Sequence, residues 1–281
     1  MNFQETSAGI LLEKCPEFDL PQTLDCGQTF RWDICKEHPR RIIGIAFGRY
    51  LELEQTSTHI LFCNTTKEEF LQIWAPYFDL HRDYRAIQKE LCHSHAVLQK
   101  AAEYAPGIRI LQQEPWEALC CFILSQNNNI PRIKGIVARL CEYFGEKIDG
   151  GYAFPSAECL ANCTVKDLAP IRSGFRAKYL LSAAQKVCDG SIMLEDMKTQ
   201  PIAQVREQLM TIHGVGPKVA ECVALYGLHR LEAFPMDVWM KRAMAQLLPG
   251  KTAEDFGAFA GIAQQYIFHY ARTCQTAMAA V

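Results

Sequence analysis

The chain has 281 residues, of which 49% are hydrophobic, and this length exceeds the roughly 100–200 residues of a usual single core, so we expect two domains. No apolar run approaches the roughly 20 residues that cross a bilayer, and the first residues show no signal-peptide pattern, which predicts a soluble, intracellular protein without a membrane partner. The net charge of −2 argues mildly against nucleic-acid binding, but residues 1–108 hold 11 Lys and Arg against 15 Asp and Glu, whereas the remainder holds 18 against 16.

Short β-like runs, separated by Gly, Pro and polar turns, occupy residues 9–62 and predict an antiparallel sheet. They include residues 29–35, 41–46, 50–54 and 59–62. Residues 66–104 then show the apolar spacing of helices, which ends near Ala105-Pro106-Gly107. We therefore predict an α+β protein, with an N-terminal antiparallel sheet-and-helix domain over residues 1–105 and an all-helical domain over residues 106–281.

The second domain shows helical periodicity almost throughout. The predicted helices cover residues 116–126, 130–144, 165–171, 177–189, 202–212, 217–226, 238–247 and 253–270. Pro217 stands at the first position of its helix, where a missing N–H has no cost, and Asp237 stands where an N-cap residue is expected.

The turn between the predicted helices 202–212 and 217–226 reads Gly214-Val215-Gly216. Apolar residues on both sides predict two helices that pack on one another across this turn. Glycines let successive backbone N–H groups approach an anion closely. The turn is therefore typical of a clamp for a nucleic-acid phosphate.

Lys218 follows this turn directly, and Asp237 stands nineteen residues later. The positive end of a helix favours a neutral amine over an ammonium, and a neutral amine is a nucleophile. Cys222 lies one helical turn further along the same face. Two interpretations stay open at this point: Lys218 binds phosphate while Asp237 only caps a helix, or the two residues carry out covalent chemistry.

The thirteen cysteines are scattered, and no CxxC pair occurs among them. The C-terminal end holds only Cys274, so neither a zinc site nor a four-cysteine iron–sulfur loop can be built there. We expect reduced thiols, no iron–sulfur cluster and no required cofactor.

Five motifs, in order, resemble those of one family. Besides the hairpin with its lysine and downstream aspartate, these are GQTFRW at 27–32, SQNNNIPR at 125–132, GFRA at 174–177 and AQQYIF at 263–268. The chain resembles the 8-oxoguanine DNA glycosylase/AP lyase branch of the helix-hairpin-helix DNA glycosylase superfamily. The resemblance implies a TBP-like N-terminal domain and a monomer that excises 8-oxoguanine from duplex DNA, preferably opposite cytosine, in base excision repair. It also implies a Schiff base at Lys218, followed by β-elimination, with Asp237 stabilising positive charge on the sugar.

The resemblance assigns four residues to the pocket for the flipped base. The Gly27 carbonyl would accept a hydrogen bond from N7, which is a donor only in the oxidised base, because guanine N7 is an acceptor. Cys222 and Phe268 would stack on the two faces of the base, and Gln264 would contact its edge. Without the family, a β-turn glycine, a buried thiol, a solvated glutamine and a core phenylalanine would be the ordinary interpretations.

Four further residues would act on the duplex around the extruded nucleotide. The resemblance places Asn127 in the gap, Arg132 and Arg176 on the opposite cytosine, and Phe175 as a wedge in the base stack. As isolated arginines, Arg132 and Arg176 would be expected in solvent. Phe175 departs from the tyrosine common in the family, which retains stacking but loses a hydroxyl contact.

The resemblance also implies two uses of the hairpin backbone. The amides of Gly214, Gly216 and Val219 would hold a DNA phosphate. A cation beside that phosphate would bind main-chain carbonyls, those of Met210, Ile212 and Val215. Trp239 replaces a histidine usual in eukaryotic members, and His213 replaces a proline.

Two other functions would explain part of this pattern. A monofunctional alkylbase glycosylase would share the N-terminal sheet but would not need Lys218, and a non-catalytic hairpin module would explain the Gly-Val-Gly turn alone. The missing cysteine cluster disfavours the endonuclease III and adenine glycosylase relatives. The expected partner is double-stranded DNA containing 8-oxoguanine, in the cytoplasm and nucleoid of a bacterium or the nucleus of a eukaryote.

Overall fold

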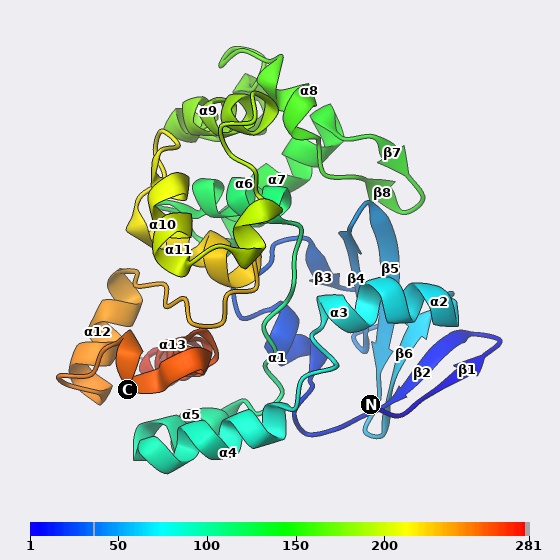
Figure 1. The fold of residues 1–281 in the computed structure, drawn as a ribbon. Coiled ribbons are helices and arrows are strands. Elements are labelled where there is room, and N and C mark those ends of the chain that lie inside the picture. The colour runs from blue at the N-terminus through cyan, green and yellow to red at the C-terminus, as the bar shows by residue number, and fades with distance from the viewer. Residues whose placement is uncertain (36, 279–281) are drawn as a thin grey trace.

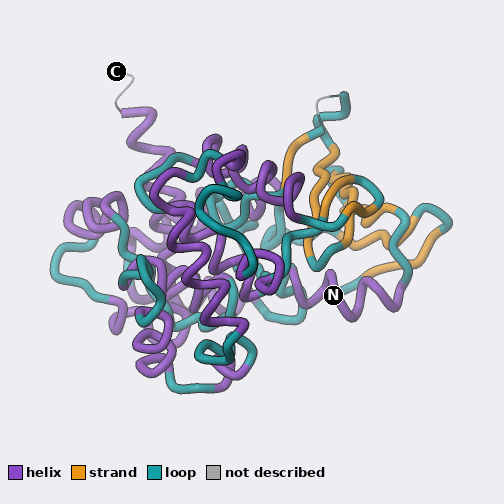
Figure 2. The backbone as a smooth tube through the Cα atoms, turned by 90° about the horizontal axis from the view of Figure 1, so that it is seen from above, coloured by secondary structure: helices purple, strands orange, loops and turns teal. Residues whose placement is uncertain are grey.

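The computed structural model describes residues 1–35 and 37–278. The six strands of the main sheet lie together at one side of the molecule, and most of the rest is helical (Figures 1 and 2). This confirms the predicted fold class, an antiparallel sheet followed by a helical domain. Within the described part of the chain, no helix is both long and apolar enough to cross a membrane.

The sheet is antiparallel and has six strands in the order β1-β2-β6-β5-β4-β3. Its strands are β1 (Phe3–Thr6), β2 (Gly9–Glu13), β3 (Trp32–Ile34), β4 (Arg41–Ala46), β5 (Arg49–Gln55) and β6 (His59–Cys63). Alternate residues of β4 and β6 are buried, as expected for strands with one face against a core. The run at 29–35 contributes only three residues to the sheet, and β1 has no counterpart among the predicted strands.

Short helices after β6 cover the buried face of the sheet (Figure 1). They are α2 (Lys67–Glu69), a π-helical turn η1 (Phe70–Trp74) and α3 (Ala75–Tyr77). Their aromatic side chains form the centre of this smaller core: the Phe70 ring lies 4.9 Å from that of Phe62, and the Trp32 indole N–H donates to the Tyr77 hydroxyl at 2.8 Å.

The remaining helices form the larger core, except α1, whose buried Leu20 and Leu24 belong to the smaller core. They are α1 (Leu20–Leu24), α4 (Tyr84–Ser94), α5 (Ala96–Tyr104), α6 (Pro115–Ser125), α7 (Ile130–Phe144), α8 (Ala157–Ala161), α9 (Ala177–Cys188), α10 (Ile202–Met210), α11 (Pro217–Tyr226), α12 (Val238–Leu247) and α13 (Ala260–Met278), with 3₁₀ turns η2 (Ala169–Ile171), η3 (Gly174–Arg176), η4 (Asp196–Thr199) and η5 (Ala253–Phe259) and a small hairpin of β7 (Lys147–Ile148) and β8 (Gly151–Tyr152). The helix α8 and the β7–β8 hairpin were not among the predicted elements.

Helices α4 and α5 precede residue 105 in the chain, yet their apolar side chains belong to the larger, helical core. Helix α13 packs against α5, and the Gln88 side-chain amide of α4 donates to the Tyr266 hydroxyl of α13 at 2.8 Å. The domain boundary at residues 105/106 therefore stays a prediction, since the two cores do not divide the chain at that point.

The predicted helix at 165–171 is wrong. The side chains of Thr164 and Asp167 bond one another and each other's backbone N–H, which replaces the helical pattern at this point. Pro170 then limits the segment to the 3₁₀ turn η2, and Arg172 leaves it in the left-handed region at φ 58°.

The predicted helix at 253–270 is two elements. Gly257 adopts φ 59° inside η5, a conformation that breaks the helical path, and α13 begins only at Ala260. Helix α13 thereby takes its own direction and carries its middle turns back to the N-terminal part of the chain, where Gln265 donates to the Cys26 carbonyl at 3.1 Å.

The loop after α1 is fixed between the two cores by Gln28, which is fully buried. Its side-chain amide donates to the carbonyls of Thr23 and Arg109 at 2.8 and 2.7 Å and accepts from the Leu111 N–H at 2.9 Å. Satisfied buried amides of this kind hold a segment rigidly. The neighbouring residue, Gly27, is therefore held in place at the side of the helical domain.

Candidate active site

Five segments far apart in sequence enclose a small cavity of about 50 Å³. They are the loop after α1, the last turn of α6, one side of α11, the loop into α12 and the first half of α13. The lining residues are Cys26, Gly27, Phe122, Lys218, Cys222, Tyr226, Pro235, Asp237, Gln264, Gln265 and Phe268. Both residues predicted to be catalytic and all four predicted for the base pocket lie in this set.

Lys218 stands in the first turn of α11, which begins at Pro217 as predicted. Its amine donates a hydrogen bond to the Ser125 hydroxyl at 3.1 Å and lies 5.4 Å from the centroid of the Phe122 ring. Both partners come from the last turn of α6. The amine is thus held at the wall of the cavity and not in open solvent.

Asp237 is the N-cap of α12, and its Oδ1 accepts from the Met240 N–H at 2.7 Å. The predicted cap is confirmed. The same carboxylate lines the cavity together with Lys218. An Asp in this position is restrained by its cap bond, so it presents a negative charge to the cavity from a fixed place.

Burial raises the pKa of the Cys222 thiol, and the nearby Lys218 opposes that shift without cancelling it. Cys222 therefore stays a neutral thiol at physiological pH. A neutral, polarisable sulfur suits contact with the face of an aromatic base better than nucleophilic attack.

Gln264 and Gln265 are both buried, but only Gln265 has its polar atoms paired. Gln265 accepts from the Tyr226 hydroxyl and donates to the Cys26 carbonyl. Gln264 is 4% exposed, and its Oε1 has no hydrogen-bond partner among the described residues. A buried, unpaired amide oxygen is costly, and in a cavity it marks a place where a ligand would donate.

Gly27 adopts φ +89°, a conformation that L side chains rarely take. A Cβ at this position would lie 3.9 Å from Phe268, so the glycine leaves its backbone beside that ring. No hydrogen bond to the Gly27 carbonyl is found within the part of the chain that the structure describes.

The predicted gap-filling residue, Asn127, lies exposed in the loop between α6 and α7 with φ 47°. The third asparagine of the motif, Asn129, caps α7 by accepting from the Arg132 N–H at 3.0 Å. The three asparagines thus stand at the start of a helix, where their side chains can bond the backbone.

Arg176 is not solvated, contrary to the expectation for an isolated arginine: it is 2% exposed. Its guanidinium donates to the carbonyls of Gln126, Asn127 and Ser173, the last two at 2.8 and 3.1 Å. Burial, with the charge of the neighbouring Arg132, lowers its pKa. In this conformation Arg176 anchors the asparagine loop and offers few free donors to a partner base.

Arg132 and Phe175 lie beside this anchor and are exposed, Phe175 at 49%. The Phe175 ring covers the Arg176 guanidinium at 4.4 Å and meets the Tyr179 ring edge-on at 5.8 Å. A half-exposed aromatic ring that packs on Arg176 and Tyr179 can insert into a base stack.

The hairpin places its two glycines in different circumstances. Gly214 adopts φ +86°, and a Cβ there would meet the Tyr179 ring at 2.3 Å, whereas Gly216 has open space around it. The amides of Gly214, Gly216 and Val219 make no hydrogen bond within the described part of the chain. The hairpin therefore offers unpaired N–H groups at the start of α11, with open space for an anion beside Gly216.

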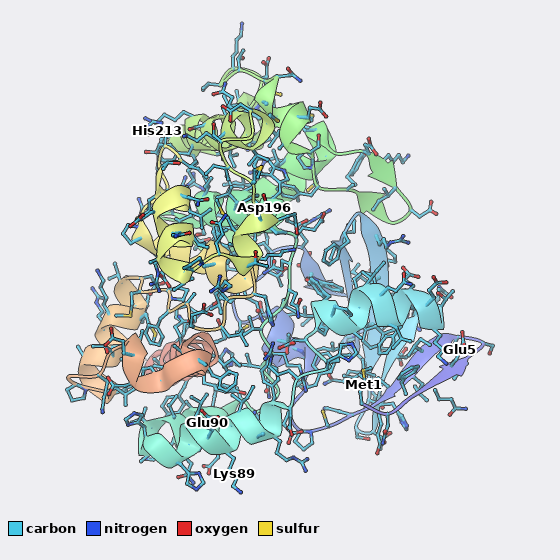
Figure 3. All side chains as sticks on the ribbon, in the orientation of Figure 1. Met1, Glu5, Lys89, Glu90, Asp196 and His213 are labelled. Atoms are coloured by element: carbon cyan, nitrogen blue, oxygen red, sulfur yellow. The ribbon has the colours of Figure 1, made fainter. Side chains whose placement is uncertain are left out.

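The carbonyls predicted to bind a cation are less uniform. Ile212 accepts from the Val215 N–H at 3.0 Å, while no bond to the carbonyls of Met210 and Val215 is found within the described residues. His213 lies exposed on the side of the helical domain away from the sheet (Figure 3), with its ring 4.9 Å from that of Tyr179. Trp239 is also exposed, close in sequence to the Asp237 cap.

Sequence reasoning missed several lining residues. Phe122, Tyr226 and Pro235 are buried apolar residues with no signal of their own, and Gln265 looks the same as Gln264 in the sequence. Ser125 belongs to the quoted asparagine motif, so its place in that motif was the one signal available.

Two family models together match most of the chain. Residues 10–119 match the 8-oxoguanine DNA glycosylase N-terminal domain, and residues 120–257 match the HhH-GPD superfamily of base excision DNA repair proteins. Together with the hairpin, lysine and aspartate around the cavity, these matches define a DNA glycosylase of the helix-hairpin-helix class.

Relatives narrow the class. The N-glycosylase/DNA lyase OGG1 of Arabidopsis thaliana is 30% identical over 283 residues, which cover 90% of this chain and 77% of the plant protein. The N-glycosylase/DNA lyase of Saccharomyces cerevisiae is 43% identical over 152 residues, only 48% of this chain and 40% of the yeast protein. The Clostridium acetobutylicum 8-oxoguanine glycosylase/lyase, solved with double-stranded DNA containing cytosine opposite 8-oxoguanine, superposes with a TM-score of 0.91 at 37% identity, covering 98% of this chain and 99% of that one. The chain belongs to the 8-oxoguanine DNA glycosylase family.

Proposed function

We propose that this enzyme removes 8-oxoguanine from duplex DNA and then cuts the strand, with Lys218 as the nucleophile, and that it prefers cytosine opposite the lesion. The observation that carries the proposal is the meeting of Lys218 and Asp237 with Gly27, Gln264 and Phe268 at one cavity. The substrate class follows from the family to which the chain belongs.

The chemistry begins at the Lys218 amine. Its lone pair attacks C1′ of the extruded nucleotide, the glycosidic bond breaks, and the base leaves with the bonding electrons and takes up a proton. The bound nitrogen loses a proton and the sugar ring opens to a Schiff base. Loss of a proton from C2′ then expels the 3′ phosphate, and water releases Lys218.

Asp237 stabilises this sequence electrostatically. Positive charge develops on the sugar as the glycosidic bond breaks, and the carboxylate at the α12 N-cap faces the same cavity. Because Oδ1 of this carboxylate is held by the Met240 N–H, little reorganisation is needed when that charge appears.

The base pocket must open before an extruded base can enter. The cavity has a volume of about 50 Å³, which is less than twice the share of about 30 Å³ that one water molecule takes in the liquid. It is therefore too small for a purine. Phe268, which is only partly buried, is the lining side chain we expect to move. The base would then donate to Gln264 Oε1 and, through N7–H, to the Gly27 carbonyl.

Arg132 and Arg176 would read the opposite base. Arg132 is free to do so from its exposed position, whereas Arg176 must first give up part of its hold on the Gln126 and Asn127 carbonyls. Preference for cytosine would then depend on that exchange, because an acceptor-rich base edge is needed to replace the lost carbonyls.

The hairpin would hold the DNA phosphate through the unpaired amides of Gly214, Gly216 and Val219. A cation beside it would bind the carbonyls of Met210 and Val215. The Ile212 carbonyl already accepts from the Val215 N–H, so it would contribute its second lone pair. No further cofactor enters the proposed reaction. Since the substrate is chromosomal DNA, we place the enzyme in the nucleoid of a bacterial cell or the nucleus of a eukaryotic one.

Base release and strand cleavage on duplexes with 8-oxoguanine opposite each of the four bases test this proposal. We expect both activities, fastest opposite cytosine. Release of alkylated purines without strand cleavage would support the monofunctional alternative, and binding without base release would support a non-catalytic module.

A further inference from the structure

Ser125 is the hydrogen-bond partner of the Lys218 amine, at 3.1 Å. It is the last residue of α6, from a segment 93 positions away in sequence. We propose that Ser125 is a positioning residue for the Lys218 nucleophile, a role that rests on the proposed function.

The direction of this hydrogen bond is fixed by a second one. The Ser125 hydroxyl has a single hydrogen, and it donates that hydrogen to the Phe122 carbonyl at 2.8 Å. Its oxygen is therefore left to accept from Lys218, whether the lysine is an ammonium or a neutral amine. With one N–H committed to Ser125, the lone pair of the neutral amine has a restricted orientation.

Phe122 completes the support on an apolar side. The amine lies 5.4 Å from the Phe122 ring centroid, within the distance at which an aromatic face attracts a cation. That ring is itself stacked on Tyr226, with centroids 5.2 Å apart and planes inclined by 21°. The last turn of α6 thus holds the amine with one neutral acceptor and one rigid ring.

A neutral acceptor has a specific advantage here. A carboxylate in the place of Ser125 would orient the lysine but would also stabilise the ammonium form, which is not nucleophilic. A hydroxyl with its hydrogen already committed orients the amine and adds no charge. Nucleophilic steps are sensitive to such orientation, since small misplacements of a reacting group can lower rates by about 100-fold.

The same segment carries the gap-filling residue. Ser125 is followed by Gln126 and Asn127, whose carbonyls Arg176 holds. The anchor that fixes Asn127 therefore also fixes the backbone that presents Ser125 to Lys218.

The competing explanation is that Ser125 only closes the last turn of α6 through Phe122. The variants Ser125→Ala and Ser125→Thr separate the two, with Ser57→Ala as a matched control, because Ser57 is exposed in the turn between β5 and β6. Three quantities are measured: the melting temperature, the Kd for a duplex with a non-cleavable abasic analogue, and the single-turnover rate of 8-oxoguanine release across pH 6 to 9.

We expect Ser125→Ala to lower the plateau rate of base release roughly tenfold, which is the effect of losing one well-placed hydrogen bond. The Kd, the melting temperature and the pH midpoint of the rate should stay unchanged. Ser125→Thr should restore the rate to within about threefold, and Ser57→Ala should match the unmodified enzyme. A Ser125→Ala enzyme with the full rate would overturn the proposal. A lower rate accompanied by weaker DNA binding, or a lower rate that Ser125→Thr does not restore, would overturn it as well.

Lys218→Gln in the same series keeps the two proposals apart. If the unmodified enzyme releases the base and Lys218→Gln does not, the proposed function stands whatever Ser125→Ala does. If the unmodified enzyme releases no 8-oxoguanine, the proposed function fails and the role of Ser125 falls with it.

Discussion

Two adjacent glutamines on α13 are placed for different tasks. Gln265 is fully paired and ties α13 to α11 and to the loop after α1, whereas the Oε1 of Gln264 has no partner among the described residues. The sequence presents them as equivalent, because they are identical residues at neighbouring positions of one predicted helix. The family motif picks out Gln264, and its unpaired oxygen supports the role in base binding that we propose for it.

Replacing each glutamine by leucine separates stability from activity. Gln264→Leu removes a buried unpaired polar group, so we expect an unfolding free energy equal to or slightly above that of the unmodified protein and a base-release rate at least tenfold lower. Gln265→Leu leaves Tyr226 and the Cys26 carbonyl unpaired and should cost about 1–3 kcal/mol of stability. Urea unfolding and single-turnover assays measure both; a Gln264→Leu enzyme that unfolds easily yet keeps its rate would refute this assignment.

Other residue roles could not be read from the sequence. The donors of Arg176 are taken by carbonyls 49 and 50 positions away, and Ser125 reaches Lys218 across 93 positions. Contacts at such separations arise only when the elements pack, and no local pattern encodes them. The motif located these residues, but only the structure shows which polar groups are occupied.

At the scale of elements, the hairpin between α10 and α11 combines a glycine that is required by packing with a glycine that is predicted to bind phosphate. Gly214 is required by its φ of +86° and by the Tyr179 ring, whereas a Cβ at Gly216 would meet no protein atom within 4 Å. Tyr179 in turn contacts both Phe175 and His213, so one ring packs against the predicted wedge residue and against the hairpin.

Alanine at each glycine should therefore act differently. Gly214→Ala is expected to cost about 1–2 kcal/mol of stability from backbone strain, plus the clash with Tyr179, and to weaken DNA binding. Gly216→Ala should melt as the unmodified protein does, because its φ is ordinary, but should bind duplex DNA several-fold more weakly, as its methyl group would meet the phosphate. Thermal melting and fluorescence anisotropy check the pair; equal DNA affinity for Gly216→Ala and the unmodified protein would exclude the phosphate clamp.

Helix bounds followed the local signals closely where caps are strong. Helices α7, α11 and α12 begin and end where predicted. Asn129 and Asp237 are the N-caps of α7 and α12, and Pro217 is the first residue of α11. The prediction failed at 165–171, where side-chain bonds of Thr164 and Asp167 compete with the helix, and at Gly257, whose left-handed backbone divides one periodic segment in two.

At the scale of the whole molecule, a buried ion cluster joins the sheet part to the helical part. The Asp79 carboxylate, just after α3, accepts hydrogen bonds from Arg82 Nε at 2.7 Å and from the Tyr84 hydroxyl at 3.2 Å. His229, which lies beyond α11, approaches the same carboxylate with its Nε2 at 3.4 Å. Burial alone would raise the pKa of Asp79, but the hydrogen bonds and charges of His229 and Arg82 hold it below its ordinary value of 3.8. This cluster was not foreseen, because its members have no common motif.

Stability should therefore depend on Asp79 in acid. The folded pKa lies below the unfolded one, so the charged carboxylate stabilises the fold above about pH 4, and that contribution is lost as the pH falls through the folded pKa. We expect Asp79→Asn to lower the unfolding free energy by about 1–3 kcal/mol at pH 7, because the buried partners of the carboxylate lose their acceptor while Arg82 is partly solvated. Urea unfolding between pH 7 and pH 3 should show this gap narrowing below about pH 4, and a gap that stays constant would contradict the account.

The overall architecture was the most predictable part, because the alternation of β4 and β6 and the periodicity of the helices are properties of short segments. The packing of α4 and α5 into the helical core was not, since it depends on where α13 returns to the N-terminal part of the chain.

The central claim is that Lys218 is the nucleophile, and borohydride trapping on a duplex with 8-oxoguanine opposite cytosine tests it most directly. Reduction of the Schiff base should yield a covalent protein–DNA adduct whose modified peptide contains Lys218, and Lys218→Gln should bind the duplex but give no adduct. An adduct that forms in Lys218→Gln to the same extent as in the unmodified protein would contradict the claim.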